Sequence, residues 1–263
     1  MKQIFILLFS FWVLSLSSQR IIQPKLVELD LKGVIYKSET SYELKIHENG
    51  FALGYNKGEV QTYYRTKFYH LEIGMLKDTR EKRQNKNYSF TSLYDSNSFV
   101  FGKINNFINV RASLGFKRYL SEKAKRKGLA VGYSYSFGPT IGILKPYYLD
   151  LFIREGGAIP EIEIVSESYS EDNADRFLNL NDIYGSSSFF KGFNKISVVP
   201  GIQAQVSSHF ALGAFDKYVK AIEIGIMMDL YIKKIDILIE SDEISNKPYF
   251  VKLFISGQLG YRK

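Results

Sequence analysis

Five charged residues occupy positions where acid–base or ion chemistry could take place, because each lies between apolar neighbours. They are Glu72, Arg111, Glu223, Asp229 and Lys252. In a chain whose side chains alternate between two faces, these five share the face opposite the apolar residues. A lone buried charge must find a partner, so we interpret the set as an ion-pair network that fills an interior and fixes strand register. The alternative is a gated path for ions or small solutes.

The histidines offer little catalytic chemistry. His47, His70 and His209 lie in different segments, and only His209 has a potential nucleophile close by, at Ser207 or Ser208. A catalytic pair needs a third group that orients the base, and the spacing does not supply one. We therefore predict no catalytic residues and no enzymatic activity, with a lipid-hydrolysing Ser-His pair as the remote alternative.

Metal and cofactor chemistry is equally weak in the sequence. The chain contains no cysteine, which excludes disulfides, thiolate ligands and lipoprotein attachment. It also lacks a glycine-rich phosphate loop and any histidine or carboxylate spacing specific for zinc or calcium. We predict no metal site and no cofactor.

The charged residues are positioned by segments with two-residue alternation, which is typical of half-buried strands. In residues 129–144, bulky residues such as Tyr135 and Phe137 alternate with small ones such as Ser134, Ser136 and Gly138. The closing segment, 249–263, alternates in the same way. Further strands are predicted at residues 61–76, 99–119, 197–212 and 217–234.

The alternation in residues 42–56 reverses its phase at Asn49-Gly50. One extra residue in a strand reverses the faces, so we interpret this as a β-bulge within a single strand. A tight hairpin at the same pair is the alternative. We favour the bulge because the hairpin would leave a strand too short to cross a bilayer. The weak alternation at residues 26–36 then supplies the first strand.

The polar face of these strands is crowded with Gly, Ser, Asn and Gln, residues too small to form the solvent-exposed face of a soluble sheet. They suit the lumen of a narrow barrel whose outer face meets lipid. The predicted fold is all-β: a transmembrane antiparallel up-and-down β-barrel of eight strands with long extracellular loops. A β-sandwich or a lipocalin-like barrel with a ligand cavity is the soluble alternative. Tracing back from the last strand places the turns 56–59, 121–128 and 213–216 on the periplasmic side.

The N-terminus predicts export. Lys2 precedes an apolar run from Ile4 to Leu16, and small serines follow, so residues 1–18 are expected to be a signal peptide and residues 19–263 an outer-membrane barrel. A retained anchor is the alternative. The formal charge of +8 is spread along the chain. It suits acidic lipid head groups better than nucleic acid, so outer-membrane lipid is the predicted partner and nucleic acid is not.

Residues 145–196 form the longest segment without clear alternation, with one short helix expected at residues 171–180 after an N-cap at Ser170. Their apolar content is too high for disorder. We expect them to fold as a cap over the barrel mouth or to offer an apolar surface to a protein partner or ligand. The candidate residues of this surface are Tyr147, Tyr148, Phe152, Phe177, Tyr184, Phe189 and Phe190. Its acidic residues are interpreted as a solvated face, with a divalent cation as the alternative.

Several motifs resemble a family of uncharacterised small outer-membrane β-barrels from Bacteroidota. They include His47-Glu48-Asn49-Gly50-Phe51, the stretch 101–107 (FGKINNF), Ser121 to Gly128, Gly213-Ala214-Phe215-Asp216 and Gln258-Leu259-Gly260. More distantly, the chain is similar to the PorT-like accessory barrels of the type IX secretion machinery. Its end departs from the usual outer-membrane pattern, since Arg262-Lys263 follow Tyr261, where an aromatic residue commonly ends the chain.

These observations together predict a non-enzymatic outer-membrane barrel with a closed lumen. We expect it to act as a structural or accessory subunit of an envelope complex. A narrow channel or a small-ligand binding barrel is the second interpretation, and a lipid-modifying barrel enzyme is the third.

Overall fold

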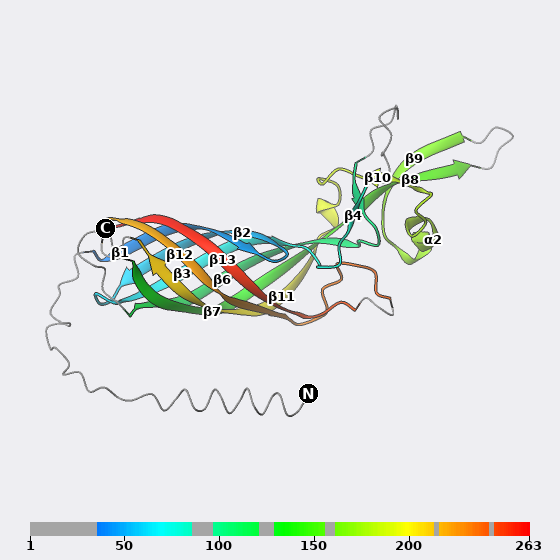
Figure 1. Cartoon of the computed structure of the whole chain (residues 1–263). Helices are drawn as coiled ribbons and strands as arrows, with labels where there is room; N and C mark the ends of the chain where they lie inside the picture. Colours follow the sequence, from blue (N-terminus) through cyan, green and yellow to red (C-terminus); the bar gives the residue numbers. More distant parts are fainter. Residues whose placement is uncertain (1–35, 86–96, 121–128, 156–160, 213–215, 242–244) are drawn as a thin grey trace, which may run out of the picture. The chain divides into compact units, whose positions relative to one another are not determined.

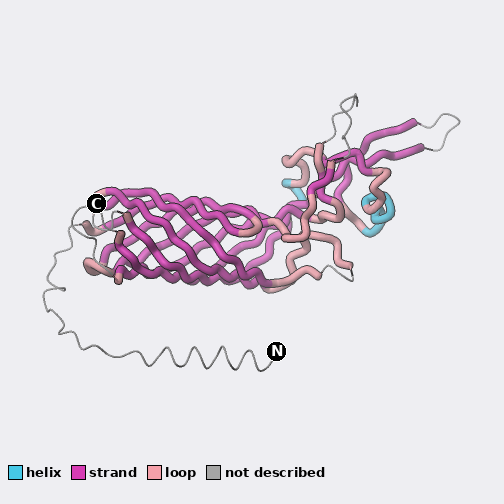
Figure 2. Tube along the Cα trace, viewed as in Figure 1, coloured by secondary structure: helices cyan, strands magenta, loops and turns pink. Residues whose placement is uncertain are grey.

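The computed structural model describes residues 36–85, 97–120, 129–155, 161–212, 216–241 and 245–263. The predicted signal peptide and nearly all of the strand predicted at residues 26–36 lie outside these ranges. The described residues form antiparallel strands with a few short helical turns (Figure 2), so the predicted all-β class is confirmed.

Eight strands close into one antiparallel barrel (Figure 1). They are β1 (Ser38–His47), β2 (Gly50–Val60), β3 (Arg65–Leu76), β6 (Asn105–Tyr119), β7 (Ala130–Pro146), β11 (Ser197–Ala211), β12 (Tyr218–Tyr231) and β13 (Tyr249–Arg262). Each strand pairs with its neighbours in chain order, and β1 pairs with β13 to close the wall, with Ser41 opposite Gly260. The predicted up-and-down barrel of eight strands is therefore confirmed.

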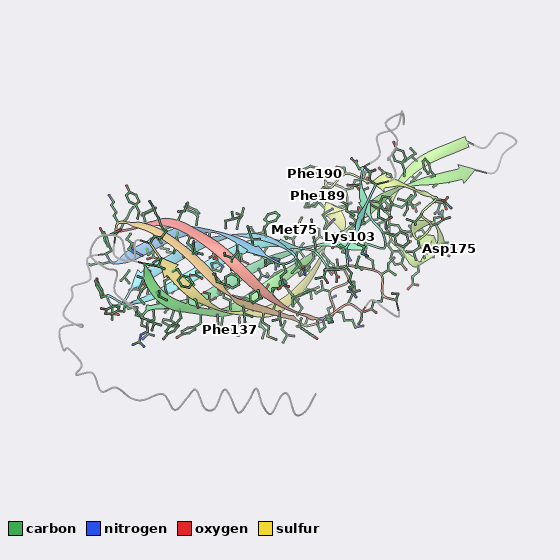
Figure 3. All side chains as sticks on the ribbon, in the orientation of Figure 1. Met75, Lys103, Phe137, Asp175, Phe189 and Phe190 are labelled. Atoms are coloured by element: carbon green, nitrogen blue, oxygen red, sulfur yellow. The ribbon has the colours of Figure 1, made fainter. Side chains whose placement is uncertain are left out.

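The faces of the wall follow the alternation of the sequence. Phe137, which points away from the wall (Figure 3), is 60% exposed, while its neighbours Ser136 and Gly138 are buried inside. The same holds around the barrel: Leu44, Leu71, Val206, Ile224 and Leu253 are exposed on the outer face. The barrel thus carries its large apolar side chains outside and its polar ones inside, the reverse of a water-soluble β-barrel.

The first two strands correct the predicted bulge. His47 pairs with Gly50, so Glu48 and Asn49 form a two-residue hairpin connection. In such a hairpin, paired residues such as Ile46 and Phe51 face the same way, which reverses the phase of the alternation along the sequence. The two strands of this hairpin are not too short, because β2 continues to Val60: they have 10 and 11 residues, enough for a tilted strand to span a bilayer.

Residues 56–59, predicted to be a turn, lie inside β2 for the same reason. The connection follows them, at residues 61–64, where the Arg65 backbone N–H donates to the Thr62 carbonyl. Gly58 lies within β2, where a Cβ would come within 2.8 Å of the Thr66 methyl group on β3. The other connections at this end of the barrel are residues 120–129 and 212–217, and the longer connections lie at the opposite end, which we call the mouth.

The mouth is filled by the connection between β12 and β13. Its residues Ile235, Ile237 and Leu238 are buried among inward-facing residues from the mouth ends of the strands, which are Leu76, Phe107, Leu144, Val199 and Tyr231. Backbone bonds hold this connection in place: the Ile104 N–H donates to the Ile237 carbonyl at 2.9 Å, and the Ile239 N–H to the Gly102 carbonyl at 2.9 Å. We call residues 235–238 the plug.

Residues 145–196 were predicted to be irregular, but their described part contains a small sheet. After β7 ends, β8 (Tyr148–Glu155) pairs with β9 (Glu161–Ser168) and β10 (Ile183–Ser186) in a small sheet, and β4 (Arg83–Gln84) pairs with β5 (Phe99–Val100). The predicted helix at 171–180 is shorter, because a 3-10 turn (Glu171–Asn173) leads into α2 (Ala174–Phe177), which ends at Phe177. A further 3-10 turn covers Phe193–Lys195.

This cap has a core of its own. Phe99, Leu149, Leu151, Phe177 and Ile183 are buried together, with Ile239 packed against them. Because Ile239 follows the plug in the chain, the cap core and the mouth core are joined by one short segment.

Candidate functional site in the barrel lumen

Arg111 is the centre of the lumen's charged cluster. From β6 it faces Asp229 on β12, and its Nε and Nη2 atoms donate to the two carboxylate oxygens at 2.8 and 2.6 Å. Its Nη1 atom donates to Glu72 on β3. All three side chains are nearly inaccessible, so a bidentate Arg–carboxylate pair and a second acid neutralise one another without water.

Lys45 extends this cluster across the barrel. Its Nζ donates to Glu72 Oε2 at 2.5 Å and to Gln205 Oε1 at 2.9 Å. His70 contacts the same Glu72 oxygen at 3.2 Å through Nε2, while its Nδ1 lies 2.6 Å from Asn56 Oδ1. Six strands therefore meet through polar side chains in this part of the lumen: β1, β2, β3, β6, β11 and β12.

Lys252 lies at the edge of the cluster. Its Nζ is 3.7 Å from Asp229 Oδ2 and 4.9 Å from the centre of the Phe250 ring. Among the described residues, this Nζ makes no hydrogen bond. The structure therefore brings together four of the five predicted residues, Glu72, Arg111, Asp229 and Lys252.

Glu223, the fifth, belongs to a separate cluster nearer the opposite end. It accepts from Ser207 Oγ at 2.8 Å and from Ser134 Oγ at 3.2 Å, and His209 Nδ1 lies 2.7 Å from its other oxygen. Close to it, Glu39 pairs with Lys117 at 3.1 Å.

The arrangement at His209 does not activate a nucleophile. The Ser207 hydroxyl donates to Glu223 instead of to the imidazole, and His209 Nε2 faces the Tyr119 hydroxyl at 3.3 Å. Ser208 is exposed on the outer face. A nucleophilic serine needs a hydrogen bond to its base, which neither serine has among the described residues.

Sequence reasoning missed the lumen charges of the first strand. Glu39, Glu43 and Lys45 alternate inward on β1 and are buried. For Glu43 and Lys45 the signal was present in the alternation of residues 42–56, which was interpreted as a bulged strand. In the observed hairpin Lys45 faces Glu72 of β3 across the lumen, whereas Glu39 pairs with Lys117 and Arg262.

Little space remains in the lumen. The cavity bordered by Glu39, Glu43, Lys117 and Glu223 measures about 10 Å³, roughly enough for one water molecule. Within the described ranges there is no group of three or more His, Asp or Glu side chains that could hold a metal ion. The helices of that part of the chain include none long and apolar enough to cross a membrane.

A buried pair also lies outside the barrel wall, in the connections at the mouth. Lys103 Nζ donates to Glu81 Oε2 at 2.7 Å, and both side chains are buried. Burial lowers the pKa of Lys103 from its ordinary value, and the Glu81 charge opposes this shift. Nearby, burial raises the pKa of Tyr147, whose hydroxyl accepts from the Val100 backbone N–H at 3.2 Å.

The seven aromatic residues predicted for the cap do not form one surface. Phe177 is buried in the cap core, Tyr147 packs against that core, and Phe152 contacts Tyr184 with ring centres 5.4 Å apart. Tyr148 is half-buried.

Only Phe189 and Phe190 are well exposed, and they form an aromatic cluster with Phe193. Phe190 is 80% exposed, and its ring centre lies 6.1 Å from that of Phe189. Lys145 Nζ sits 4.6 Å from the Phe189 ring centre and donates to the Lys191 carbonyl at 3.0 Å. Phe193 was not among the seven candidates, although the run Phe189-Phe190-Lys191-Gly192-Phe193 signals it. We call Phe189, Phe190 and Phe193 the aromatic triad.

The wall and its interior define the class of protein: an eight-stranded antiparallel barrel with an apolar outer face and an ion-paired lumen. No family model matches the chain, and no curated protein matches it. The crystal structure of the N-terminal β-barrel domain of Pseudomonas aeruginosa OprF is similar, with 8% sequence identity and a TM-score of 0.35 over 87% of this chain and 98% of that domain.

Proposed function

We propose that this protein is an outer-membrane β-barrel with a closed lumen that acts as a structural or accessory subunit of an envelope complex. The observation that carries the proposal is the apolar outer face. Isoleucine, leucine, valine, phenylalanine and tyrosine side chains are exposed around the whole barrel. Exposed apolar area of this extent is unfavourable in water, and a closed barrel leaves no unpaired strand edge in lipid.

The filled interior supports a structural role over a channel. The Arg111 cluster crosses the lumen and the plug fills its mouth, so a solute would have to break several buried ion pairs to pass. Ion pairs that join strands also fix their register, which suits a rigid scaffold. We propose that the protein has no enzymatic activity, in keeping with the unactivated serines beside His209.

The cap supports the accessory part of the proposal. It is folded around its own core and presents the aromatic triad, whereas a cap that served only to seal the barrel would bury such side chains. The resemblance to small barrels of Bacteroidota and to type IX secretion accessories agrees with this role, with the N-terminal signal peptide directing export.

Two measurements test the proposal. An unboiled gel should show the folded chain at a different apparent mass from the boiled chain, and migration at one mass would contradict a membrane barrel. A tagged copy extracted from its native membranes in mild detergent should bring a companion at near-equal amount. Recovery of the protein alone would contradict the accessory role.

Matched variants locate the contact. Replacing Phe189, Phe190 and Phe193 by serine should release the companion. Replacing the exposed Leu178 and Leu180, which precede β10 in the chain, should not. If both variants keep the companion, the aromatic triad is not the contact surface.

A small-ligand binding barrel is the second candidate. It is favoured by one specific observation, a cavity of about 400 Å³ beside the plug.

A further inference from the structure

The small sheet of the cap ends in a strand that has one unpaired edge. The strand order is β10-β8-β9, and among the described residues β9 pairs only with β8 (Figure 1). The backbone of β10, at the other end of the sheet, has a further bond, from the Ser186 N–H to the Asn97 carbonyl at 3.2 Å. An unpaired strand edge offers backbone donors and acceptors to any strand that can approach it.

The bonds of β8 show which backbone groups of β9 point to the unpaired side. The Phe152 N–H donates to the Asp182 carbonyl at 2.7 Å, so the N–H and C=O groups of Phe152 point toward β10. Ile164 of β9 lies directly opposite Phe152. The N–H and C=O groups of Ile164, and those of Ser166 two residues later, therefore point away from β8. We call the backbone groups of Ile164 and Ser166 the free edge.

The free edge is bounded at Ser168. Asn173, in the 3-10 turn after β9, donates through Nδ2 to the Ser168 carbonyl at 2.9 Å. The Ser168 carbonyl is accessible to Asn173 because it points to the same side as those of Ile164 and Ser166. The backbone groups of Ile164 and Ser166 have no such partner in the part of the chain that the structure describes.

One face of the sheet carries a row of apolar side chains that leads to the free edge. Tyr184 of β10 contacts Phe152 of β8 with ring centres 5.4 Å apart, and Phe152 lies opposite Ile164 of β9. Ile164 is 47% exposed. A side chain of an added strand beside Ile164 would cover this exposed area. The free edge therefore favours an apolar residue at that position.

The charges of the cap favour a basic partner. Residues 148–186 contain nine acidic and two basic side chains, a net charge of −7, whereas the whole chain carries +8. Glu163 is exposed on β9, on the face opposite to that of Ile164, and Glu171 and Asp172 are exposed in the turn that follows the strand. Acidic side chains attract a basic strand and repel an acidic one.

The same charges disfavour a second copy of the chain as the occupant. Two β9 strands paired edge to edge would bring Glu163 and Glu167 of each copy close to the same acids of the other. Like charges on paired strands are destabilising, and edge strands commonly carry charges that prevent self-association. The acidic residues thus leave the free edge available to a strand of opposite charge.

We propose that the free edge of β9 binds an extended basic polypeptide segment, which joins the cap sheet as a fourth strand. The backbone of this segment forms hydrogen bonds with Ile164 and Ser166. Its apolar residues extend the row beyond Ile164, and its Lys or Arg residues alternate with them on the face of Glu163. In this mode of recognition, backbone bonds supply affinity and alternate side chains supply selectivity. The free edge is separate from the aromatic triad, and the proposal does not depend on the accessory role.

The experiment measures amide hydrogen exchange in the full chain, labelled with ¹⁵N and folded in micelles of an uncharged detergent. The probe is a peptide as long as β9, eight residues, in which lysine and valine alternate. Binding should slow exchange of the Ile164 and Ser166 amides about tenfold or more, because their N–H groups acquire acceptors. The Glu163 and Val165 amides, which point to β8, are the internal control. Unchanged exchange at Ile164 and Ser166 would overturn the proposal.

Three further peptides separate backbone bonding from charge and from side-chain pattern. The first is methylated at alternate backbone nitrogens, the second has glutamate in place of lysine, and the third has its lysines and valines in two blocks. Each should bind about tenfold more weakly than the alternating peptide. Equal binding of the methylated peptide would show attraction by charge alone, and equal binding of the glutamate peptide would show adhesion to the micelle. Either result would overturn the proposal.

Variants of β9 locate the bonds. Ile164→Pro removes a free-edge N–H without removing a bond to β8, and proline is tolerated on edge strands. It should weaken binding about tenfold, whereas Ile164→Ala, which keeps the N–H, should weaken it only a few-fold. Glu163→Lys should weaken binding mainly at low salt, since exposed charges are screened. Glu59→Lys, at an exposed position on β2, is the charge-matched control and should bind as the unaltered chain does.

Equal binding by the Ile164→Pro and Ile164→Ala variants would overturn the assignment of the free edge. If Ile164→Pro opens the cap sheet, seen as lost protection at Glu163 and Val165, the methylated peptide decides the question. Protection of Ile164 and Ser166 that appears without peptide and increases with protein concentration would show pairing of two copies, which would also overturn the proposal.

Discussion

The lumen and the mouth of this barrel are both closed, but by opposite chemistries. The lumen is closed by charged residues from facing strands, which meet as Arg111 with Asp229 and Lys45 with Glu72. The mouth is closed by apolar side chains of a connection, with Ile235 and Ile237 among the strand ends. Ion pairs have directional geometry and tolerate few alternatives, whereas apolar packing depends mainly on area and volume. The ion pairs of the lumen therefore fix the positions of the barrel strands, whereas the apolar side chains that fill the mouth can be exchanged more readily.

The largest expected effect is in the lumen. R111A removes the cation between two buried acids, so Glu72 and Asp229 are left close together without their shared partner. Breaking a buried pair in this way is expected to reduce the free energy of unfolding by about 3–5 kcal/mol. Urea unfolding followed by the unboiled gel measures it.

The same variant separates structure from transport. If the network is only structural, R111A in planar bilayers should stay closed, because the plug still fills the mouth. Steady conductance would favour the gated path instead. A loss of stability below 1 kcal/mol would contradict the central role of Arg111 in holding the wall.

A smaller effect is expected at the plug. I237A removes buried methyl groups from the mouth core, which should reduce the free energy of unfolding by about 2–4 kcal/mol in the same titration. Val251→Ala on the outer face is the matched control, and it should change stability little in micelles. An equal loss in both variants would show that the plug is not a core position.

The Lys103–Glu81 pair should give a still smaller, pH-dependent effect. Burial places the pKa of Lys103 in the native chain below its ordinary value of 10.5. At a pH between the native pKa and 10.5, the unfolded chain therefore binds more protons than the native chain. The free energy of unfolding should therefore increase as the pH is raised across this interval. Unfolding measured at several alkaline pH values in the unaltered chain and in K103M should show this slope only in the former.

The smallest stability effect is expected at the aromatic triad. F190S changes an exposed side chain, so unfolding should be altered by less than about 0.5 kcal/mol. A Trp probe gives the sharper measurement: Trp12 is the only tryptophan, so in W12F/F190W fluorescence reports position 190. Quenching by brominated lipid would place the triad at the membrane. Ile202→Trp on the outer face and Leu180→Trp on the cap are the positive and negative controls.

The alternation of side chains was sufficient to predict the wall, its two faces and the inward direction of Glu72, Arg111, Asp229 and Lys252. Each strand must present one face to an apolar medium, so apolar residues recur at every second position of the sequence. The hairpin at Glu48-Asn49 was misjudged because a bulge and a two-residue turn produce the same phase reversal, and only the partner strand distinguishes them.

The mouth could not be predicted in this way. Whether Ile237 or Phe177 enters a core depends on contacts between segments far apart in the chain, and no periodic pattern marks them. Residues 145–196 were predicted to cap the mouth, but the plug that fills it comes from the connection after β12. The separation of Glu223 from the Arg111 cluster likewise follows from strand stagger, which alternation does not reveal.

The pairing of β1 with β13 joins the first and last strands of the described barrel. Arg262 points inward and binds Glu39 at 2.8 Å, while the backbone N–H of Lys263 donates to the Ser38 carbonyl at 2.9 Å. The Arg262 side chain and the Lys263 backbone therefore join the last strand to the first. Bringing together residues so distant in sequence costs loop-closure entropy. The Glu39–Arg262 ion pair can form only when the strands between these two residues are in register, so it depends on the alignment of the whole wall.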